Sequence, residues 1–452
     1  MSKETFPFTS TSLRSLRVEQ ELQEWEDARR ALAHRRAMSR APLPPAPRPP
    51  PRHQERRRVQ EVRAAPPQVR CRDTAIHNTF MCGDMKGVYA VLKDPAMSVF
   101  APCVPVSGMW TLSSKVKQTS ALRLAASRGH SSCVEELLFR GAEANADPGG
   151  NTALHDACIG GHSVCVQLLL SHGADPELLT SDGCAPLHLC TSAQSFHCAE
   201  LLLDDGAEVN VRMRESRLTP LHVAARRGLE KHVELFLSHN ADVKATNREG
   251  ETPLNAACSG AERPSEAGRY LGVVQMLMEA GADPRTAGRK MHTPLHNACA
   301  NCSPRIVEIL LQHGAKADVS NSAGFTPLDC LLQVALKSMK AEQEPGSVAR
   351  SLLNHGAKPV PPKMLKQCIL SPATLEVLLN SYTSIPPCDW MDSLPTDVYE
   401  SFFDLVHTRS NQPRSLQHLC RCALRLPLGA RCFSVLSKLD IPRSHMHDTK
   451  QP

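Results

Sequence analysis

The chain has 452 residues, a formal net charge of +6 at pH 7 and 18 cysteines. No apolar stretch approaches the ~20 residues that a membrane-spanning helix needs, and no basic-then-apolar segment resembling a secretory signal opens the sequence. Composition therefore argues against a membrane or secreted protein, and we expect one of the cytoplasm, with the nucleus as a second compartment. In such a reducing compartment the cysteines are expected to be thiols that pack in the core.

Residues 1–71 are predicted to be a basic, proline-rich arm. Residues 1–70 hold 15 Lys and Arg against 8 Asp and Glu, so the excess of positive charge lies there. Apolar residues at helical spacing between Val18 and Leu32 predict one short amphipathic helix, whereas the run APLPPAPRPPPR from Ala41 predicts a stiff extended spacer. We expect the arm to be largely disordered, and binding of nucleic acid by its cations is the less favoured alternative.

Residues 72–118 are predicted to cap the array that follows. They begin with the outline of a helix-turn-helix unit, in which the motif of the array is weakened to Thr74-Ala75-Ile76-His77. A less regular connection that includes Trp110 comes next. Such deviation is expected at the end of an array, because one face of a terminal unit meets water.

A motif of the form Thr-Pro-Leu-His-x-Ala recurs between residues 119 and 360. Its leucines, separated by 32, 33, 34, 33, 41 and 33 residues, are Leu122, Leu154, Leu187, Leu221, Leu254, Leu295 and Leu328. This spacing predicts a repeat of about 33 residues. Thr-Pro suits the first helical turn, because threonine can cap a helix and the φ of proline is already helical. An apolar run at helical spacing follows, and glycine closes most units, so seven two-helix units are predicted.

Two places lengthen this period. Eight additional residues, 261–268, are expected between the two helices of one unit, and residues 337–346 lengthen a later unit. Insertions into an array of this kind project from one face. Contacts with a partner and tolerated loops are equally good explanations of both.

A C-terminal cap and linker is predicted for residues 361–410, with two short apolar helices within 363–382. A second motif lies at 413–424. Here Leu416, Cys420 and Leu424 are spaced i, i+4 and i+8, which places them in one stripe of a helix. The residues that define this helix are Pro413, Ser415, Leu416, Leu419, Cys420, Ala423 and Leu424.

The repeated motif resembles the ankyrin repeat, in which two antiparallel helices and a hairpin loop stack side by side. The pattern Ser-Leu-x-x-x-Cys-x-x-x-Leu resembles the BC box that opens a SOCS box, so the whole chain is similar to the ankyrin repeat and SOCS box proteins. The resemblance implies an all-α fold, an ankyrin solenoid followed by a small helical SOCS box at 411–442. It also implies a non-catalytic subunit of a ubiquitin ligase, whose array binds an unknown protein target. The SOCS box would bind elongin C, and with it elongin B, through the seven residues of the predicted BC-box helix.

Cullin 5 with its RING protein is the further partner that the resemblance implies. The family's cullin box carries Leu-Pro-φ-Pro, and the matching residues are Leu439, Asp440, Ile441 and Pro442, so that aspartate replaces the first proline. The polar tail at 443–452 is expected to be disordered. Leu439, Ile441 and Pro442 are the implied cullin contacts, and the alternative is a scaffold or competitor that binds target and elongins without cullin.

The candidate contacts with the target are arginines of the array loops, namely Arg214, Arg217, Arg248, Arg263 and Arg289. The recurring motif histidines are implied to bridge neighbouring loops; they are His155, His188, His222 and His296. Asn145 and Asn210 resemble asparagines that ankyrin proteins offer to a hydroxylase. No nucleotide-binding or hydrolase motif is visible, Cys299 and Cys302 lack a second pair at zinc-ribbon spacing, and we expect no catalytic residue, cofactor or metal.

Overall fold

The computed structural model describes residues 74–93, 109–112, 117–147, 150–262, 266–335, 345–368 and 371–384, and the single residues 406 and 423. The chain divides into two compact units, Met1–Ala64 and Ala65–Pro452, and every described residue belongs to the second. The predictions for the arm, for most of the SOCS box, for the C-terminal tail and for residues 337–344 of the second insertion lie outside the described residues.

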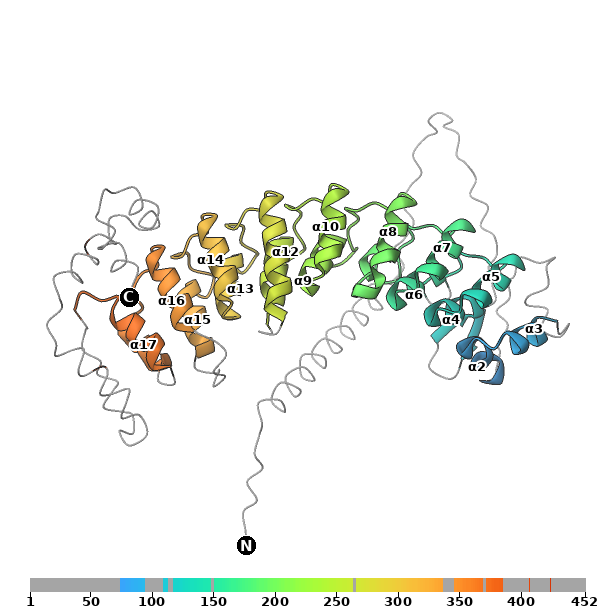
Figure 1. The fold of residues 1–452 in the computed structure, drawn as a ribbon, viewed down its shortest axis with the longest axis horizontal. Coiled ribbons are helices and arrows are strands. Elements are labelled where there is room, and N and C mark those ends of the chain that lie inside the picture. Colours follow the sequence, from blue (N-terminus) through green and yellow to red (C-terminus); the bar gives the residue numbers. More distant parts are fainter. Residues whose placement is uncertain are drawn as a thin grey trace, which may run out of the picture. The chain divides into compact units, whose positions relative to one another are not determined.

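Helix pairs follow one another along the described array, which confirms the predicted ankyrin fold (Figure 1). The first helices pack on one another, as α9 does on α11, and the second helices do the same, as α5 does on α7. The seven pairs are α4 (Ala121–Arg128) with α5 (Ser131–Phe139), α6 (Ala153–Gly160) with α7 (Ser163–Ser171), η2 and η3 (Pro186–Leu189, Ala193–Ser195) with α8 (Phe196–Asp204), α9 (Pro220–Arg227) with α10 (Glu230–Ser238), α11 (Pro253–Gly260) with α12 (Ala267–Glu279), α13 (Pro294–Ala300) with α14 (Pro304–Gln312), and α15 (Pro327–Ala335) with α16 (Pro345–Asn354).

Further helices flank the seven pairs. Before them come α2 (Thr74–Cys82) and α3 (Met85–Lys93), and α2 packs on α4. After them come the 3-10 helix η5 (Pro362–Cys368) and α17 (Pro372–Leu379), which pack on α15 and α16 respectively. The first and last pairs of the array are therefore covered by additional helices.

The motif residues set the boundaries of the first helices. Thr219 precedes α9, and its hydroxyl accepts a hydrogen bond from the backbone N–H of His222 at 3.4 Å, while Pro220 occupies the first helical position. At the other end Gly228 adopts φ 64°, a left-handed conformation that glycine tolerates and that ends the helix.

The core is a continuous layer between the two rows of helices. The motif leucines are buried in every unit, with exposed fractions of 5% or less, as at Leu154 (0%) and Leu221 (1%). Burial of one leucine is worth roughly 1.5–3 kcal/mol, so the repeated leucine is a main source of the stability of the stack. Cys158, Cys258 and Cys299 are all 0% exposed, as expected of small packing residues.

A two-stranded antiparallel sheet precedes the first pair, where we expected an irregular connection within an all-α chain. It joins β1 (Met109–Leu112) to β2 (Lys117–Ser120), with Trp110 opposite Thr119. Aromatic and β-branched residues favour strands, but a stretch this short gives too weak a pattern for prediction.

The third pair begins with 3-10 turns in place of an α-helix. Ser195 donates its hydroxyl proton to the carbonyl of Ser192 at 2.7 Å and accepts a hydrogen bond from the Ser192 N–H at 3.2 Å. Serine side chains that bond to the local backbone compete with helical hydrogen bonds, which explains why the first helix of this unit is shortened.

The first insertion differs from our expectation that it lies entirely between two helices. Its last two residues, Ala267 and Gly268, belong to α12, which has 13 residues where α10 has 9. Tyr270 in this added turn is 4% exposed and donates a hydrogen bond to the carbonyl of Arg226 at 3.1 Å. The end of the insertion therefore lengthens α12, and Tyr270, two residues after the insertion, packs in the core. Among the described residues no helix is long and apolar enough to cross a membrane.

Candidate interaction surfaces

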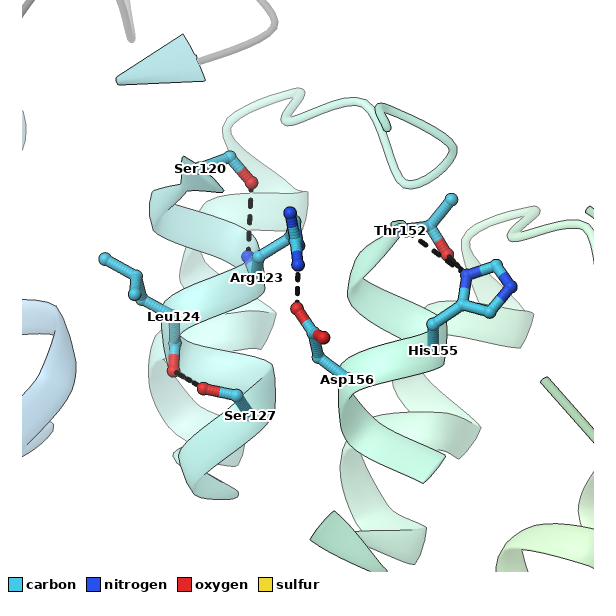
Figure 2. A network of polar contacts seen from close by, with 7 residues as sticks. All are labelled: Ser120, Arg123, Leu124, Ser127, Thr152, His155 and Asp156. Carbon is cyan, nitrogen blue, oxygen red and sulfur yellow. Dashed lines mark hydrogen bonds and ion pairs between the residues drawn. The ribbon is translucent and has the colours of Figure 1, made fainter. Parts of the chain in front are cut away.

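Buried motif histidines join four of the seven units to the loop that follows. His155 is 0% exposed; its Nδ1 accepts hydrogen bonds from the N–H and the hydroxyl of Thr152, at 3.2 and 2.8 Å (Figure 2). Its Nε2 donates to the carbonyl of Leu178 in the following loop at 2.9 Å. The equivalent Nε2 contacts, at 2.9 to 3.1 Å, are made by His188, His222 and His296, which confirms the predicted bridging role.

These imidazoles are neutral structural links. Burial lowers the pKa of all four below the ordinary value of 6.5, to about 4 for His188 and His222. Both ring nitrogens of His222 are engaged, because Nδ1 accepts from Thr219 and Nε2 donates to the carbonyl of Glu251. A histidine held in this way has no free nitrogen with which to act as a general base or a metal ligand.

Three units carry another residue at the histidine position: Arg123 in the first, Asp329 in the seventh and, in the fifth, Asn255. Its Nδ2 donates to the carbonyls of Thr286 and His292, at 3.4 Å each, and its buried Oδ1 has no hydrogen-bond partner among the described residues. A buried acceptor without a partner costs roughly 1–3 kcal/mol. The fifth unit is thus less well joined to its neighbour than the units that carry histidine.

The loops between units are joined tip to tip by backbone hydrogen bonds. Successive tips pair through the N–H of Arg214 and the carbonyl of Gly183 (3.3 Å), Arg248 and Ser216 (2.8 Å), Arg289 and Glu249 (2.6 Å), and Ser322 and Lys290 (3.0 Å). Each tip is therefore held in register with the previous one, and side chains at equivalent tip positions form a row along the array.

Four of the five predicted target-binding arginines lie on three consecutive tips of this row. Arg214 and Arg217 share one tip, Arg248 lies on the next and Arg289 on the third, whereas Arg263 lies outside the described residues. All four are exposed, and no ion pair or side-chain hydrogen bond joins their guanidinium groups to another described residue. The structure thus places the four side chains on neighbouring tips of one row.

Two further residues of this surface were not predicted from the sequence. Lys290 is exposed beside Arg289, and Met291 is 49% exposed with φ 55°. Arg217 also has a positive φ, of 57°, and Arg217 and Met291 occupy the position that is Gly250 on the tip between them, where φ is 74°. Alignment of the repeats with one another would have shown that glycine is missing at these two positions. We call Arg214, Arg217, Arg248, Arg289, Lys290 and Met291 the basic tip surface.

A different arginine of the array is paired internally. Arg123 on α4 donates from Nε to Oδ2 of Asp156 on α6 at 2.7 Å, and the two side chains are 13% and 15% exposed (Figure 2). Ser120, the cap of α4, accepts a hydrogen bond from the backbone N–H of Arg123 at 3.2 Å. This contact joins two first helices and was not predicted from the sequence.

The two candidate hydroxylation sites have matching environments. Asn145 donates from Nδ2 to the carbonyl of Gly173 at 2.9 Å and accepts from the N–H of Asp175 at 2.7 Å. Asn210 makes the equivalent contacts to Asn240 (3.3 Å) and Asp242 (2.8 Å). Both side chains therefore tie one loop to the next.

The two cysteines of the CxxC pattern are core residues. Cys299 is 0% and Cys302 5% exposed, and burial raises the pKa of the Cys302 thiol to about 11 and that of Cys299 well above its ordinary value. Both thiols are therefore protonated at neutral pH, whereas metal ligation and nucleophilic attack need a thiolate. No group of three potential metal ligands occurs among the described residues.

The predicted elongin-binding segment is represented by one described residue. Ala423 is helical and exposed, while Pro413, Ser415, Leu416, Leu419, Cys420 and Leu424 lie outside the described residues, as do Leu439, Ile441 and Pro442. Val406, which precedes this segment, is 3% exposed and belongs to the apolar core of the array.

Comparison with known families matches both parts of the chain. The sequence model of the family "Ankyrin repeats (3 copies)" matches residues 122–213, 212–286 and 265–361, and that of the family "SOCS box" matches residues 412–444.

Three curated relatives show the extent of the likeness. Ankyrin repeat and SOCS box protein 16 from Homo sapiens is 45% identical over 98% of this chain and 96% of its own length, and its Mus musculus counterpart is 44% identical over the same shares. Human ankyrin repeat and SOCS box protein 18 is 46% identical over 75% of this chain and 74% of its own length. The likeness to protein 16 extends over nearly the full length of both chains, and the ankyrin repeat and SOCS box models both match this chain. This chain therefore belongs to the ankyrin repeat and SOCS box protein family.

Proposed function

We propose that the protein is the substrate-recognition subunit of an elongin B/C, cullin 5 and RING ubiquitin ligase. The observation that carries the proposal is a SOCS box match at 412–444 behind ankyrin repeats that match 122–361 in one chain. The array holds the target protein, the SOCS box holds the elongins, and the chemistry belongs to other subunits. The target is thereby ubiquitinated and degraded. Tethering speeds the transfer of ubiquitin, because it raises the effective concentration of target lysines near the loaded conjugating enzyme.

Elongin C binds the stripe of Leu416, Cys420 and Leu424, with Pro413, Ser415, Leu419 and Ala423 completing the contact. The exposed Ala423 supports this proposal, because a side chain on the contact face has to be accessible in the absence of the partner. A small residue at Cys420 allows the helix to approach closely. Elongin B joins through elongin C.

Cullin 5 is recruited through Leu439, Ile441 and Pro442. The SOCS box match extends to residue 444 and so includes these positions, which supports the proposal. The alternative is a scaffold or competitor that holds target and elongins without cullin, and the observation that favours it is Asp440 in place of a proline.

The target contacts lie on the array loops, at Arg214, Arg217, Arg248 and Arg289, with Arg263 from the first insertion. The guanidinium groups of Arg214, Arg217, Arg248 and Arg289 are exposed and form no ion pair with another described residue, which supports this assignment. Asn145 and Asn210 are the candidate hydroxylation sites, and mass spectrometry of the protein from cells would show a gain of one oxygen atom on each. We place the protein in the cytoplasm, with the nucleus as a second compartment.

The test is co-expression of the full chain with elongin B, elongin C and cullin 5, followed by size exclusion. Burial of a leucine is worth roughly 1.5–3 kcal/mol, so Leu416→Ala should weaken elongin binding by about tenfold or more. Gln417→Ala, one position further round the same helix, is the matched control and should co-elute normally. Co-elution of all three partners supports the ligase receptor, and elongins without cullin support the scaffold. Unchanged elongin binding by Leu416→Ala would refute the assignment of the contact.

A further inference from the structure

We propose that the basic tip surface binds an extended, acidic segment of the target protein, of about six residues. The inference rests on the proposed function, in which the array holds a protein target, and it names the chemistry that the array selects.

The charge of the surface is positive and confined to three tips. Arg214, Arg217, Arg248, Arg289 and Lys290 supply five cations, and the carboxylates beside them are the exposed Glu215 and Glu249 and the half-buried Glu251, so five positive and three negative charges leave two net positive charges. The preceding tip carries the anion Asp182, and the following tip, at 321–324, carries no charge. The positive charge that attracts anions therefore extends over three tips and does not continue onto the tip before them or the tip after them.

The spacing of the tips fits an extended chain. Neighbouring units pack with helix axes roughly 8–10 Å apart, so three tips span about 16–20 Å. An extended strand rises about 3.3 Å per residue, so roughly three residues separate consecutive tips. Acidic residues three positions apart in such a segment would meet one tip after another.

The surface is held in place before a partner arrives. Hydrogen bonds from Arg248 to Ser216 (2.8 Å) and from Arg289 to Glu249 (2.6 Å) join the three tips through their backbones. Rigid presentation of binding groups reduces the entropy that is lost on association.

Two of the tips also retain backbone strain. Arg217 (φ 57°) and Met291 (φ 55°) adopt the left-handed conformation that glycine adopts at the equivalent Gly250. A non-glycine residue in this region is strained, and such residues are concentrated at binding and catalytic sites. The presence of an arginine and an exposed methionine at these positions is explained if both side chains contact the partner. Met291 would contact an apolar residue at one end of the acidic segment.

A nucleic acid fits the same surface less well. Glu215 and Glu249 directly follow Arg214 and Arg248 in the chain, so a continuous phosphate backbone would meet negative charge on two of the three tips. The tip sequences MRESR, NREG and GRKM contain no aromatic residue on which a base could stack. Separate carboxylates on a protein segment can avoid both acids.

The test is fluorescence anisotropy with the purified full chain. The probe is a labelled 12-residue peptide with glutamate at every third position, serine between them and one leucine near an end, and the control peptide has glutamine in place of glutamate. We expect the glutamate peptide to bind at least tenfold more tightly, and its binding to weaken as salt rises from 50 to 300 mM, because exposed charges are screened.

The double variant Arg248→Glu/Arg289→Glu avoids the two strained positions and should reduce binding of the glutamate peptide by roughly tenfold or more. The matched control is Arg305→Glu/Lys366→Glu, which reverses two exposed cations away from the tips and should change the affinity less than twofold. Circular dichroism verifies that both variants are folded.

Three results would overturn the inference. The first is equal affinity for the glutamate and glutamine peptides, and the second is an equal loss of affinity in both double variants. The third is tighter binding of single-stranded oligothymidine than of the peptide, if this binding is lost in Arg248→Glu/Arg289→Glu. Co-elution of the same preparations with elongins B and C is measured in parallel. Elongin binding without peptide binding overturns the acidic segment alone, whereas peptide binding without elongins overturns the ligase function and leaves the tip surface as an acidic-peptide site.

Discussion

Replacement of Asn255 by histidine should stabilise the protein. In the neighbouring units the histidine Nδ1 accepts from the preceding threonine, as His222 does from Thr219 at 2.8 Å, and Nε2 reaches the next loop at 3.0 Å. Asn255 makes only two long contacts of 3.4 Å to that loop and leaves Oδ1 buried without a partner among the described residues. One hydrogen bond adds about 1 kcal/mol and removal of an unsatisfied acceptor a similar amount, so Asn255→His should add roughly 1–2 kcal/mol.

The assay is hydrogen exchange of the full chain, because units of a repeat array open separately and each reports its own free energy. Amides of α11 and α13 should exchange more slowly in Asn255→His, by about a factor of ten. The reciprocal variant His222→Asn introduces the same defect at α9 and should speed exchange there by a similar factor. If Asn255→His instead speeds exchange in α11 while His222→Asn behaves as expected, the 286–292 loop is adapted to asparagine and our reasoning about its orphan oxygen is wrong.

The pKa values of His188 and His222 are about 4 in the folded protein, below the unfolded value of 6.5, so the folded state binds fewer protons. The stability that these histidines contribute is fully present above pH 6.5 and falls as the pH drops toward 4, by up to roughly 3 kcal/mol for each. Urea unfolding between pH 7 and pH 4 measures this loss. Asp156→Ala should cost about 1–2 kcal/mol, between the values for exposed and for fully buried pairs, and a double-mutant cycle with Arg123→Ala should show coupling that disappears if the pair is only incidental. Met291→Gly should raise the free energy of unfolding by about 1 kcal/mol through relief of the left-handed backbone, so a less stable Met291→Gly protein would contradict the strain that we assign there.

The fold was predictable because the repeat shows the same physical solution seven times. Each Thr-Pro start, buried leucine and terminal glycine is a weak signal alone, but recurrence at 33 residues makes the combination decisive. The departures arose where one unit differs from its neighbours. A single serine at position 195 does not predict 3-10 turns, because their formation depends on its hydrogen bonds to Ser192. The longer α12 is accompanied by a hydrogen bond from Tyr270 to the carbonyl of Arg226 in another unit, which the sequence does not reveal.

The candidate site was predictable in residue type but not in pairing. Arg123 and Arg248 both lie within the array, and the sequence around them does not show which one is paired: Glu251 follows Arg248 by three residues, whereas no acid lies within four residues of Arg123. The structure distinguishes them, because Asp156 lies 2.7 Å from Arg123 on the adjacent helix, 33 residues away, whereas Arg248 forms no ion pair with another described residue. Contacts between repeats thus decide which charges remain available to a partner.

The position of the strained tips within the array supports their role in binding. An array is stabilised by the interfaces between neighbouring units, so a central unit has two such interfaces and a terminal unit one. The tips with Arg217 and Met291 lie between the third and fourth units and between the fifth and sixth, where both sides are packed. Strain of about 1 kcal/mol at either end of the stack would promote fraying, whereas in the centre it is opposed by two interfaces and by the hydrogen bonds between tips. The tip backbones that are strained therefore lie where interfaces on both sides oppose local unfolding.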